Sequence, residues 1–553
     1  MLLAKVSIIM AKPVLIVGAG PVGLTMACEL HRYGIPFRII DKLEKPSEQS
    51  KALVVWPRTL ELLSPLGVTK EFTNTGFYAR GGHFYSQNKR LGTFEIRIDD
   101  SRFKQALMIS QCQTESILTN YLRKNGIYID RGVTWLEQQE NNNRIQVKLQ
   151  LKDGNIETAD YEYVIACDGA HSPIRHHLGI EFAGEQDPHD WFLADVELLG
   201  LDDPSYLHLC LSSIGPVALF PFGKNHYRVI GDMGFAASSE KRKDPLQEEV
   251  QAILDERTIL KCKIIKSIWL SSFRVHQRKV KKYRQGRCFL MGDAAHIHSP
   301  AGGQGMNTGM QDAINLAWKL AYVLRGYAPM EILDTFSVER EQIGQQILAM
   351  TGRVTKMMLL QNPILKRLRN TFLALMLSVP PITRLLARQM AQMRIAYSHS
   401  PLHQEGKGFF PNGIKLGERV PDGEMIFLSK SGVKQKIYLW DLLQNPSWKL
   451  IIWTDQAMMI DEANRFVNHF ANLFRNQIQC IILLGGTEFS FDHSAVICLA
   501  LDPEKIFGKK LGVTALSSVF LVRPDGYLSY RQQSFQISPT EAYLRKWLFP
   551  SCE

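Results

Sequence analysis

The residues best suited to chemistry lie between positions 286 and 318, where an acidic turn and a glycine-rich loop separate an apolar run from a helical pattern. Asp293 offers a carboxylate to ligand hydroxyl groups, and the glycines that follow let backbone amides approach a flat, anionic ligand closely. His296 and His298 flank the loop, but no further cluster of cysteine, histidine or carboxylate joins them, so a metal site is not predicted. The segment therefore predicts a site for a flat, anionic ligand.

A second candidate site is the Gly-x-Gly-x-x-Gly sequence at residues 18–23, which follows an apolar, β-branched run at 14–17 and opens a helical pattern at 24–33. Its first glycine permits a tight turn, its second lets the backbone approach a pyrophosphate, and its third allows close packing of helix on strand. Asp41 ends the next predicted strand, about 20 residues further on, where a carboxylate meets ribose hydroxyls. The unit predicts a dinucleotide, NAD or FAD, in contact with Gly18, Gly20, Pro21, Gly23, Asp41 and Lys42.

Residues 168–175, Asp-Gly-Ala-His-Ser-Pro-Ile-Arg, form a third segment after an apolar run at 163–167. Together the three segments resemble those of the class A, aromatic-hydroxylase type of FAD-dependent monooxygenase, in the long form that includes phenol hydroxylase and hydroxyphenylpropionate hydroxylase. The resemblance decides between the two dinucleotides and implies FAD as the cofactor. It places Asp168 and Gly169 near the pyrophosphate, Asp293 on the ribityl chain, and Gly303, Gly305, Met306 and Asn307 at the flavin ring.

The resemblance extends to shorter segments and implies three more cofactor contacts, which are Lys51, Arg58 and Gln111. Family members usually carry arginine where Lys51 stands, and lysine keeps the charge but loses the two-pronged guanidinium group. Pro300 and Gly303, in the Pro/Gly loop of the first segment described, are the predicted catalytic positions.

The activity implied by the resemblance is hydroxylation of an aromatic or polycyclic compound. NADPH or NADH would reduce FAD, O2 would react with it, and a flavin C4a-hydroperoxide would pass one oxygen to the ring. Phe220, Phe222 and Tyr227 are predicted to line the substrate site, on strands expected between residues 192 and 273. Phenol hydroxylase has arginine where Phe222 stands, so plain phenol is disfavoured. Two alternatives stay open: another flavin oxidoreductase, and a catalytically silent flavoprotein that binds a partner or a membrane.

The predicted fold is α/β: a Rossmann-like FAD-binding domain with an interleaved β-sheet substrate domain, followed by a C-terminal thioredoxin-like α/β domain. The expected boundaries are 12–180 for the first part of the FAD-binding domain, 181–280 for the substrate sheet, 281–405 for the second part with a set of basic helices, and 413–550 for the C-terminal domain. Thr454, Asp455 and Gln456 stand where the Cys-x-x-Cys of thioredoxin would begin, so no thiol redox role is expected.

Composition and charge indicate which classes of binding partner and which cellular location to expect. The net charge is +11, but no Lys/Arg block with interleaved aromatic residues predicts nucleic-acid binding. Nine cysteines without a Cys-x-x-Cys motif favour a reducing, cytoplasmic location, and no apolar run reaches the roughly 20 residues of a transmembrane helix. Residues 353–400 contain eight Lys or Arg and no Asp or Glu. This pattern fits helices packed on the flavin domain, a homodimer contact, or peripheral contact with an anionic membrane.

Overall fold

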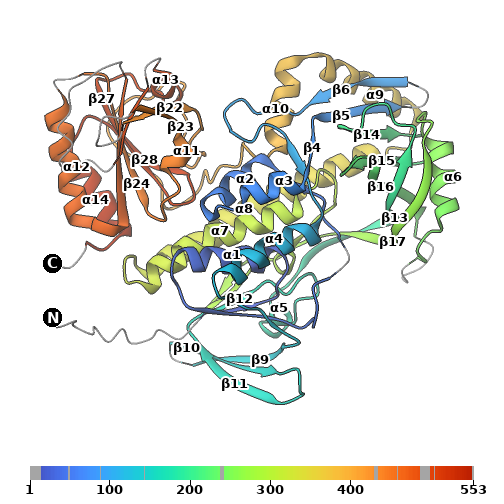
Figure 1. The fold of residues 1–553 in the computed structure, drawn as a ribbon, viewed down its shortest axis with the longest axis horizontal. Coiled ribbons are helices and arrows are strands. Elements are labelled where there is room, and N and C mark those ends of the chain that lie inside the picture. Colours follow the sequence, from blue (N-terminus) through green and yellow to red (C-terminus); the bar gives the residue numbers. More distant parts are fainter. Residues whose placement is uncertain are drawn as a thin grey trace.

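The computed structural model describes residues 14–47, 50–86, 89–141, 143–236, 242–428, 434–456, 459–485, 498–502 and 505–550. Within these ranges three large sheets frame the molecule, and the third of them forms a separate lobe at the C-terminal end (Figure 1).

A largely parallel sheet near the middle of the molecule carries the three segments singled out above. Its strands run in the order β18 (Arg284–Gln285), β19 (Cys288–Leu290), β12 (Val164–Ala166), β1 (Val14–Val17), β2 (Phe37–Asp41) and β8 (Asp130–Arg131). Strand β1 pairs in parallel with β2 and β12, and β12 pairs in parallel with β19. The carboxyl ends of these four strands therefore share one edge of the sheet. The short apolar runs predict such strands because helices cover both faces of a parallel sheet.

Helix α1 (Pro21–Arg32) follows β1 and packs against α7 (Gly305–Leu324) and α4 (Gln111–Lys124). Helix α8 (Asp334–Met358) continues the chain after α7. The shorter helices of this part are α2 (Pro57–Leu63), α3 (Thr69–Thr75) and α5 (Pro173–His177). Two small sheets complete it: β3 (Val54–Val55), β7 (Ala106–Met108) and β4 (Phe77–Ala79), and then β9 (Thr134–Asn141), β10 (Arg144–Gln150) and β11 (Ile156–Tyr161).

The second large sheet corresponds to the predicted substrate domain. Its order is β20 (His296–Ile297), β17 (Lys263–Lys279), β13 (Ala183–Leu199), β16 (His226–Phe235), β15 (Pro216–Pro221), β14 (Tyr206–Leu211), β5 (Gly81–Ser86) and β6 (Lys89–Glu95). Strands β5 and β6 precede the range 181–280 in the chain, so the sheet takes in residues that the expected boundaries leave out. Helix α6 (Gln247–Arg257) packs on one face of this sheet.

Helices α9 (Pro363–Ser378) and α10 (Pro380–Met390) pack beside β6 and meet at an angle of 97°. The bend falls at Pro380, which cannot continue a helix because it lacks an N–H donor. Asn370 of α9 donates a hydrogen bond to Ser86 Oγ of β5 at 2.7 Å. The end of α10 contacts the FAD-binding part, where Gln304 Nε2 donates to Met390 O at 3.1 Å. The basic helices therefore pack on the substrate sheet through β6 and, at the end of α10, also on the FAD-binding part, where Ala387 and Ala391 share a cluster with Val54 and Trp56.

The third sheet belongs to the C-terminal lobe. Its order is β21 (Gln404–Glu405), β28 (Leu528–Gln533), β27 (Ser517–Val522), β24 (Trp448–Thr454), β25 (Ile478–Leu484), β26 (Cys498–Leu501), β22 (Glu424–Leu428) and β23 (Lys434–Tyr438). Its helices are α11 (Leu439–Leu442), α12 (Ile460–Phe474), α13 (Ile506–Leu511) and α14 (Ile537–Trp547). The thioredoxin-like identity of this lobe stays a prediction.

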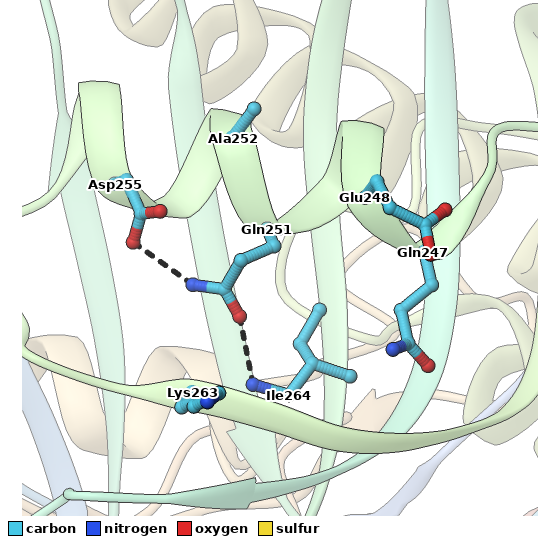
Figure 2. A pocket seen from close by; sticks show the side chains of 7 residues that line it. All are labelled: Gln247, Glu248, Gln251, Ala252, Asp255, Lys263 and Ile264. Carbon is cyan, nitrogen blue, oxygen red and sulfur yellow. Dashed lines mark hydrogen bonds between the residues drawn. The ribbon is translucent and has the colours of Figure 1, made fainter.

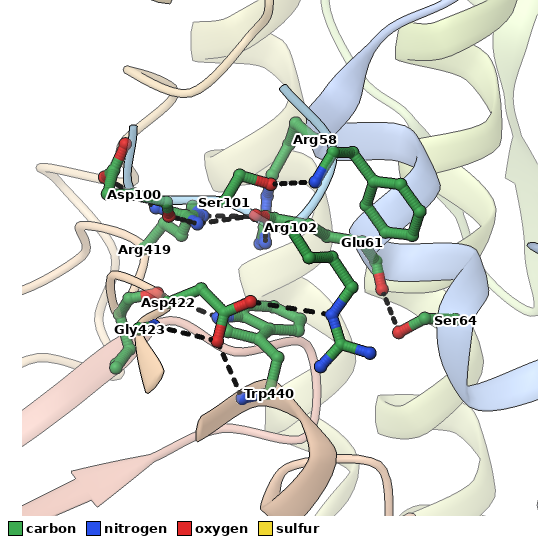
Figure 3. A network of polar contacts seen from close by, with 12 residues as sticks. Arg58, Glu61, Ser64, Asp100, Ser101, Arg102, Arg419, Asp422, Gly423 and Trp440 are labelled. Carbon is green, nitrogen blue, oxygen red and sulfur yellow. Dashed lines mark hydrogen bonds and ion pairs between the residues drawn. The ribbon is translucent and has the colours of Figure 1, made fainter. Parts of the chain in front are cut away.

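Buried ionic contacts join the C-terminal lobe to the rest of the protein (Figure 3). Arg419, between β21 and β22 of the lobe, donates to both carboxylate oxygens of Glu61 in α2 and also pairs with Asp100 at 3.1 Å. Arg523, on the lobe, pairs with Glu339 in α8 at 2.5 Å. Because these charges are removed from water, the interface requires each of them to keep its partner.

Candidate active site

The three segments singled out in the sequence meet at the carboxyl edge of the parallel sheet. The glycine loop follows β1, Asp168 follows β12, and Asp293 follows β19. Gly18 has φ +103°, and a Cβ atom there would overlap the backbone carbonyl oxygen of Cys167, which immediately precedes the 168–175 segment. A Cβ atom on Gly309 in α7 would lie 2.6 Å from Val22 in α1. Glycine at these positions therefore lets the 18–23 loop and the start of α1 approach the other two segments closely.

The glycine loop leaves an open space at the start of α1. Gly20 caps the helix without a side-chain hydrogen bond, and a Cβ atom on Gly20 would meet nothing within 4 Å. A Cβ atom on Gly23, in contrast, would overlap the carbonyl oxygen of Gly18. The first N–H groups of a helix lack intrahelical acceptors and lie at the positive end of its dipole. This loop can therefore receive a phosphate beside Gly20.

Asp41 lies at the end of β2 and shapes the same loop. Its Oδ2 accepts a hydrogen bond from the Ala19 N–H at 2.7 Å, and its Oδ1 accepts one from the Leu43 N–H at 2.8 Å. An ionised carboxylate has further lone pairs, so Asp41 can still accept from a hydroxyl of a ligand. Lys42 is exposed beside it, and Pro21 is buried at the first position of α1.

Asp293 and Asp168 are carboxylates with raised pKa values. Desolvation by the surrounding protein raises the pKa of Asp293, and the charges of His296 and Lys51 oppose this rise. The residue still has surface that solvent can reach. Protein thus surrounds this carboxyl group without covering it. Burial also raises the pKa of Asp168, whose Oδ2 accepts from the Ile174 N–H at 3.3 Å. The other oxygen, Oδ1, is buried and has no hydrogen-bond partner among the described residues.

The loop at 300–307 is held by side chains from β3 and its neighbours. Trp56 Nε1 donates to the carbonyl groups of Gly302 and Gly303, both at 3.2 Å. Asn307 donates to Val54 O at 2.8 Å and accepts from the Trp56 N–H at 2.8 Å. Gly303 has φ +60° and donates its N–H to Pro300 O at 2.9 Å, while Pro300 itself is exposed.

These hydrogen bonds fix the start of α7, which includes Gly305 and Met306. The Asn307 side chain is buried and bonded to Trp56, Val54 and Gly303, so its backbone is the part that we expect to meet a ligand.

Asp312 in α7 ties the acidic turn to the helix. It accepts from the Gly292 N–H at 3.0 Å and from His296 at 2.8 Å, and it pairs with Arg340 at 2.6 Å. Burial by itself would raise the pKa of Asp312, but Arg340 and His296 hold it below its usual range. His296 thus has the structural role in the turn that the sequence favoured over metal binding.

Acid should weaken the contacts that Asp312 makes with Gly292, His296 and Arg340. A carboxyl group with a depressed pKa in the folded state stabilises the fold above its unfolded pKa of about 4, and this stabilisation is lost as the pH falls through the folded value. Replacing Asp312 with asparagine should cost about 1.5–3 kcal/mol at pH 7, because hydrogen bonds to a charged group are lost. The difference in thermal midpoint between the variant and the wild type should shrink below pH 4. A difference that is constant between pH 7 and pH 3 would contradict this role.

Arg58 is not a cofactor contact, which corrects the prediction. Its side chain is fully buried, donates to Asp525 O at 3.0 Å and lies over the rings of Trp440 and Tyr527, at 4.9 and 4.7 Å from their centroids. Arg58 therefore serves the contact with the C-terminal lobe. Gln111 remains near the site: its Oε1 accepts from the Ala52 N–H at 3.3 Å, next to Lys51.

The three predicted substrate residues separate onto two faces of the sheet. Phe220 and Phe222 belong to an apolar cluster that includes Trp56 and Val54 beside the 300–307 loop. Tyr227 faces the other side, where it is buried in the cluster under α6, and burial raises its pKa to about 12. Tyr227 therefore does not line one site together with Phe220 and Phe222, as the sequence predicted, because strand pairing directs alternate residues to opposite faces.

Sequence reasoning missed Trp56, Arg228 and His298. Trp56 gave no motif signal, since its role depends on a loop nearly 250 residues away. Arg228 pairs with Phe220 across β15 and β16, binds both oxygens of Asp195 at 2.7 Å, and donates to Lys51 O at 3.2 Å. His298 was noted only as a weak metal ligand. Its Nδ1 bonds to Ser299 O at 2.8 Å, and burial lowers its pKa to about 4, so it is neutral at pH 7.

A surface recess between α6 and β17 lies on the far face of the substrate sheet (Figure 2). Gln251 donates to Asp255 Oδ1 at 2.9 Å and accepts from the Ile264 N–H at 2.7 Å. The Gln251 side chain thus anchors α6 to β17. The recess itself is remote from the converging segments.

The groups around the converging segments fit a flavin dinucleotide. The starts of α1 and α7 offer backbone N–H groups to anionic atoms, and neither has a side-chain cap. Asp41 and Asp293 offer carboxylates to hydroxyl groups, and Asp168 holds a buried oxygen without a partner in the described part of the chain. A dinucleotide with a hydroxylated chain and a flat, anionic ring would use these groups together. The fold and the site define a flavoprotein of the FAD-binding class.

Known proteins share both the sequence and the fold. The family described as FAD binding domain matches residues 11–351. The 6-methylpretetramide 4-monooxygenase of Streptomyces rimosus is 32% identical over 529 residues, which are 94% of this chain and 90% of that protein. The pentachlorophenol 4-monooxygenase of Sphingobium chlorophenolicum is 28% identical over 94% of this chain and 93% of its own. The structure of anhydrotetracycline hydroxylase from Streptomyces rimosus aligns with a TM-score of 0.75, at 28% identity, over 98% of this chain and 100% of its own.

The chain belongs to the FAD-dependent monooxygenases of aromatic compounds. It is an enzyme of this type, with FAD as its cofactor and NAD(P)H and O2 as the co-substrates typical of the family.

Proposed function

We propose that this enzyme hydroxylates a polycyclic aromatic compound that binds between the 300–307 loop and the inner sides of α9 and α10. The observation that carries the proposal is a continuous cluster of aromatic and apolar side chains at this place, here called the apolar cluster. Its members include Val54, Trp56, Phe84, Phe94, Phe220, Phe222, Leu377, Leu386 and Met390. A large, flat, apolar substrate is the ligand that such a surface binds best.

We assign the cofactor contacts by their positions. FAD, when bound, supplies the redox chemistry with NAD(P)H and O2. The pyrophosphate lies at the start of α1, the adenosine ribose at Asp41, the ribityl chain at Asp293, and the ring at the start of α7. The remaining proposed contacts are Gly18, Gly20, Pro21, Gly23, Lys42, Lys51, Gln111, Asp168, Gly169, Gly303, Gly305, Met306 and Asn307. Pro300 and Gly303 shape the loop that faces the substrate, and the apolar cluster keeps water from the reacting ring.

Two features favour a polycyclic substrate over a simple phenol. Phe222 stands where phenol hydroxylase carries arginine, and Arg228, on the same sheet face as Phe220, has its guanidinium group bonded to Asp195. Neither Phe222 nor Arg228 therefore offers a free positive charge to a phenolate. The relatives named above include enzymes of 6-methylpretetramide and anhydrotetracycline, which supports the same class of substrate.

The decisive experiment measures NAD(P)H oxidation and product hydroxylation by the FAD-loaded enzyme against matched sets of phenols and polycyclic aromatics. The proposal expects a polycyclic compound to accelerate NAD(P)H oxidation and to be recovered with one added oxygen atom. Faster turnover of simple phenols, or oxidation that yields only peroxide with every polycyclic compound, would overturn it.

Phe220→Ala should raise KM for that substrate while Tyr227→Phe should not. Full burial of a phenylalanine side chain is worth about 1.5–3 kcal/mol, which corresponds to roughly 10- to 150-fold in affinity. Tyr227 lies on the opposite face of the sheet and serves as the matched control. Equal KM values for Phe220→Ala and the wild type would place the substrate elsewhere.

We also propose a cytoplasmic location, on the basis of the cysteine pattern, and the domain limits 12–180, 181–280, 281–405 and 413–550, with β5 and β6 added to the substrate domain and β21 added to the C-terminal domain. The C-terminal lobe is proposed to be thioredoxin-like without its redox motif. Limited proteolysis that releases fragments ending within these domains, and not near residues 406–412, would contradict the last boundary.

A further inference from the structure

Helices α9 and α10 have an outward apolar face that no described part of the protein covers. On α9 the side chains of five large apolar residues are between 47% and 69% exposed, and these are Ile364, Leu365, Leu368, Phe372 and Leu375. Their spacing places them along one stripe of the helix. Arg369 and Leu373 are the buried residues of α9, so the helix packs inward by a different side. Apolar surface of this extent, concentrated on one element, marks an interaction site.

The stripe lies within a stretch of chain that carries charge of one sign. Residues 353–400 contain no acidic residue, and five of their basic side chains are exposed and form no ion pair with a described residue: Arg353, Lys356, Arg367, Arg384 and Arg394. Arg388, in contrast, is directed inward to Asp100. In Figure 1, α9 and α10 lie at the upper edge of the molecule beside β5 and β6. The exposed charges that residues 353–400 contribute are therefore all positive.

We propose that α9 and α10 dock on the surface of an anionic lipid bilayer, with the α9 stripe inserted among the lipids and the basic side chains at the headgroups. Apolar and basic residues on one exposed helical face are the combination that binds such a surface. A second copy of this chain fits less well, because a two-fold interface brings the same patch against itself. The unpaired basic residues would then face one another, and like charges across an interface destabilise it.

The geometry favours helices that lie on the membrane and do not cross it. No single helix in the described residues is long and apolar enough to span a bilayer, and α9 and α10 meet that test only as a bent pair. Their 16 and 11 residues extend about 24 and 17 Å, less than the roughly 30 Å of a hydrocarbon core. Their inner sides are also held by the substrate sheet.

Docking at this place would bring a lipid surface beside the proposed substrate site. Leu377 of α9 and Leu386 and Met390 of α10 belong to the apolar cluster, so the same two helices contribute to both surfaces. An apolar polycyclic compound dissolved in the bilayer could then reach the site without passing through water. This consequence rests on the proposed function, whereas docking itself does not.

The test uses the full-length, FAD-loaded protein and sedimentation with vesicles of phosphatidylcholine, with or without phosphatidylserine. We expect binding to the anionic vesicles only, weakened by salt because exposed charges are screened. Arg367→Gln with Arg384→Gln should weaken binding about 25-fold, since each basic residue near such a surface contributes roughly fivefold. Leu368→Ser with Phe372→Ser should abolish binding. Phe409→Ser, which changes a side chain 71% exposed outside the helix pair, is the control and should bind normally.

Three results would overturn the proposal: no vesicle binding, equal binding with and without phosphatidylserine, or a dimer in solution that Phe372→Ser dissociates. FAD content and thermal midpoint verify that each variant is folded. The glutamine variant changes only exposed charges, so it decides the question if the serine variant does not fold. Because no turnover is measured, failure of docking is distinguishable from failure of the proposed hydroxylation.

Discussion

Gly20→Ala is expected to give a folded protein that binds FAD poorly, whereas Gly23→Ala is expected to prevent the domain from folding. A Cβ atom on Gly20 meets nothing within 4 Å of protein, so it extends into the space proposed for the phosphate. Loss of one hydrogen bond to a charged group costs about 1.5–3 kcal/mol, which corresponds to roughly 10- to 150-fold in Kd. A Cβ atom on Gly23 overlaps the Gly18 carbonyl group, and backbone at the turn cannot move away as a side chain can.

The two variants are matched, since both add one methyl group within the same loop. Titration of the apoprotein with FAD measures affinity, and thermal unfolding of the apoprotein measures stability without the stabilisation that bound cofactor adds. If Gly20→Ala bound FAD as the wild type does, the phosphate would not lie at that glycine. If Gly23→Ala unfolded at the wild-type temperature, the close packing of α1 on its loop would be refuted.

Arg523→Met is expected to destabilise the whole protein by about 3–5 kcal/mol, the cost of leaving a buried charge without its partner. Arg523 is completely buried and pairs with Glu339 at 2.5 Å and with Asp525 at 2.5 Å. Glu339 also forms an ion pair with Lys319 at 2.7 Å, so its charge is still partly compensated in the Arg523→Met variant. Among the described residues, the Asp525 carboxylate retains only neutral donors, which are Trp318 at 3.2 Å and Asn315 at 3.4 Å.

The matched control is Arg545→Met, which removes an arginine whose pair with Glu541 is 48% and 22% exposed. Exposed ion pairs contribute about 0–1 kcal/mol, so this variant should unfold almost as the wild type does. Denaturant unfolding, followed by fluorescence, compares the two. A loss of less than 1 kcal/mol for Arg523→Met would show that the lobe does not depend on this network.

The dinucleotide unit was predictable because its signals are local. The strand–glycine–helix order at residues 14–33 and the carboxylate of Asp41 each depend on neighbours within one turn or strand. Short apolar runs predicted β1, β2 and β12, and the Pro/Gly loop correctly preceded a helix, α7. The FAD-dependent class followed from three such segments considered together, and the comparisons confirm it.

Positions whose role depends on distant partners were predicted less well. Arg58 was assigned to the cofactor from a short segment around it, yet its side chain donates to Asp525, more than 400 residues away. Tyr227 and Phe222 are both aromatic residues on neighbouring strands, but strand pairing places them in clusters on opposite faces. Trp56 carries no motif, and its hydrogen bonds to the 300–307 loop exist only because β3 and α7 pack together.

The sequence by itself determined the dinucleotide fold, the flavin class and the basic character of residues 353–400, because backbone preferences and charge are properties of neighbouring residues. Only the tertiary structure decided which aromatic residues share a face with the 300–307 loop, that β5 and β6 complete the substrate sheet, and that the apolar stripe of α9 stays uncovered. The physical reason is that a side chain's surroundings depend on strand register and on elements far along the chain, which local residue patterns do not specify.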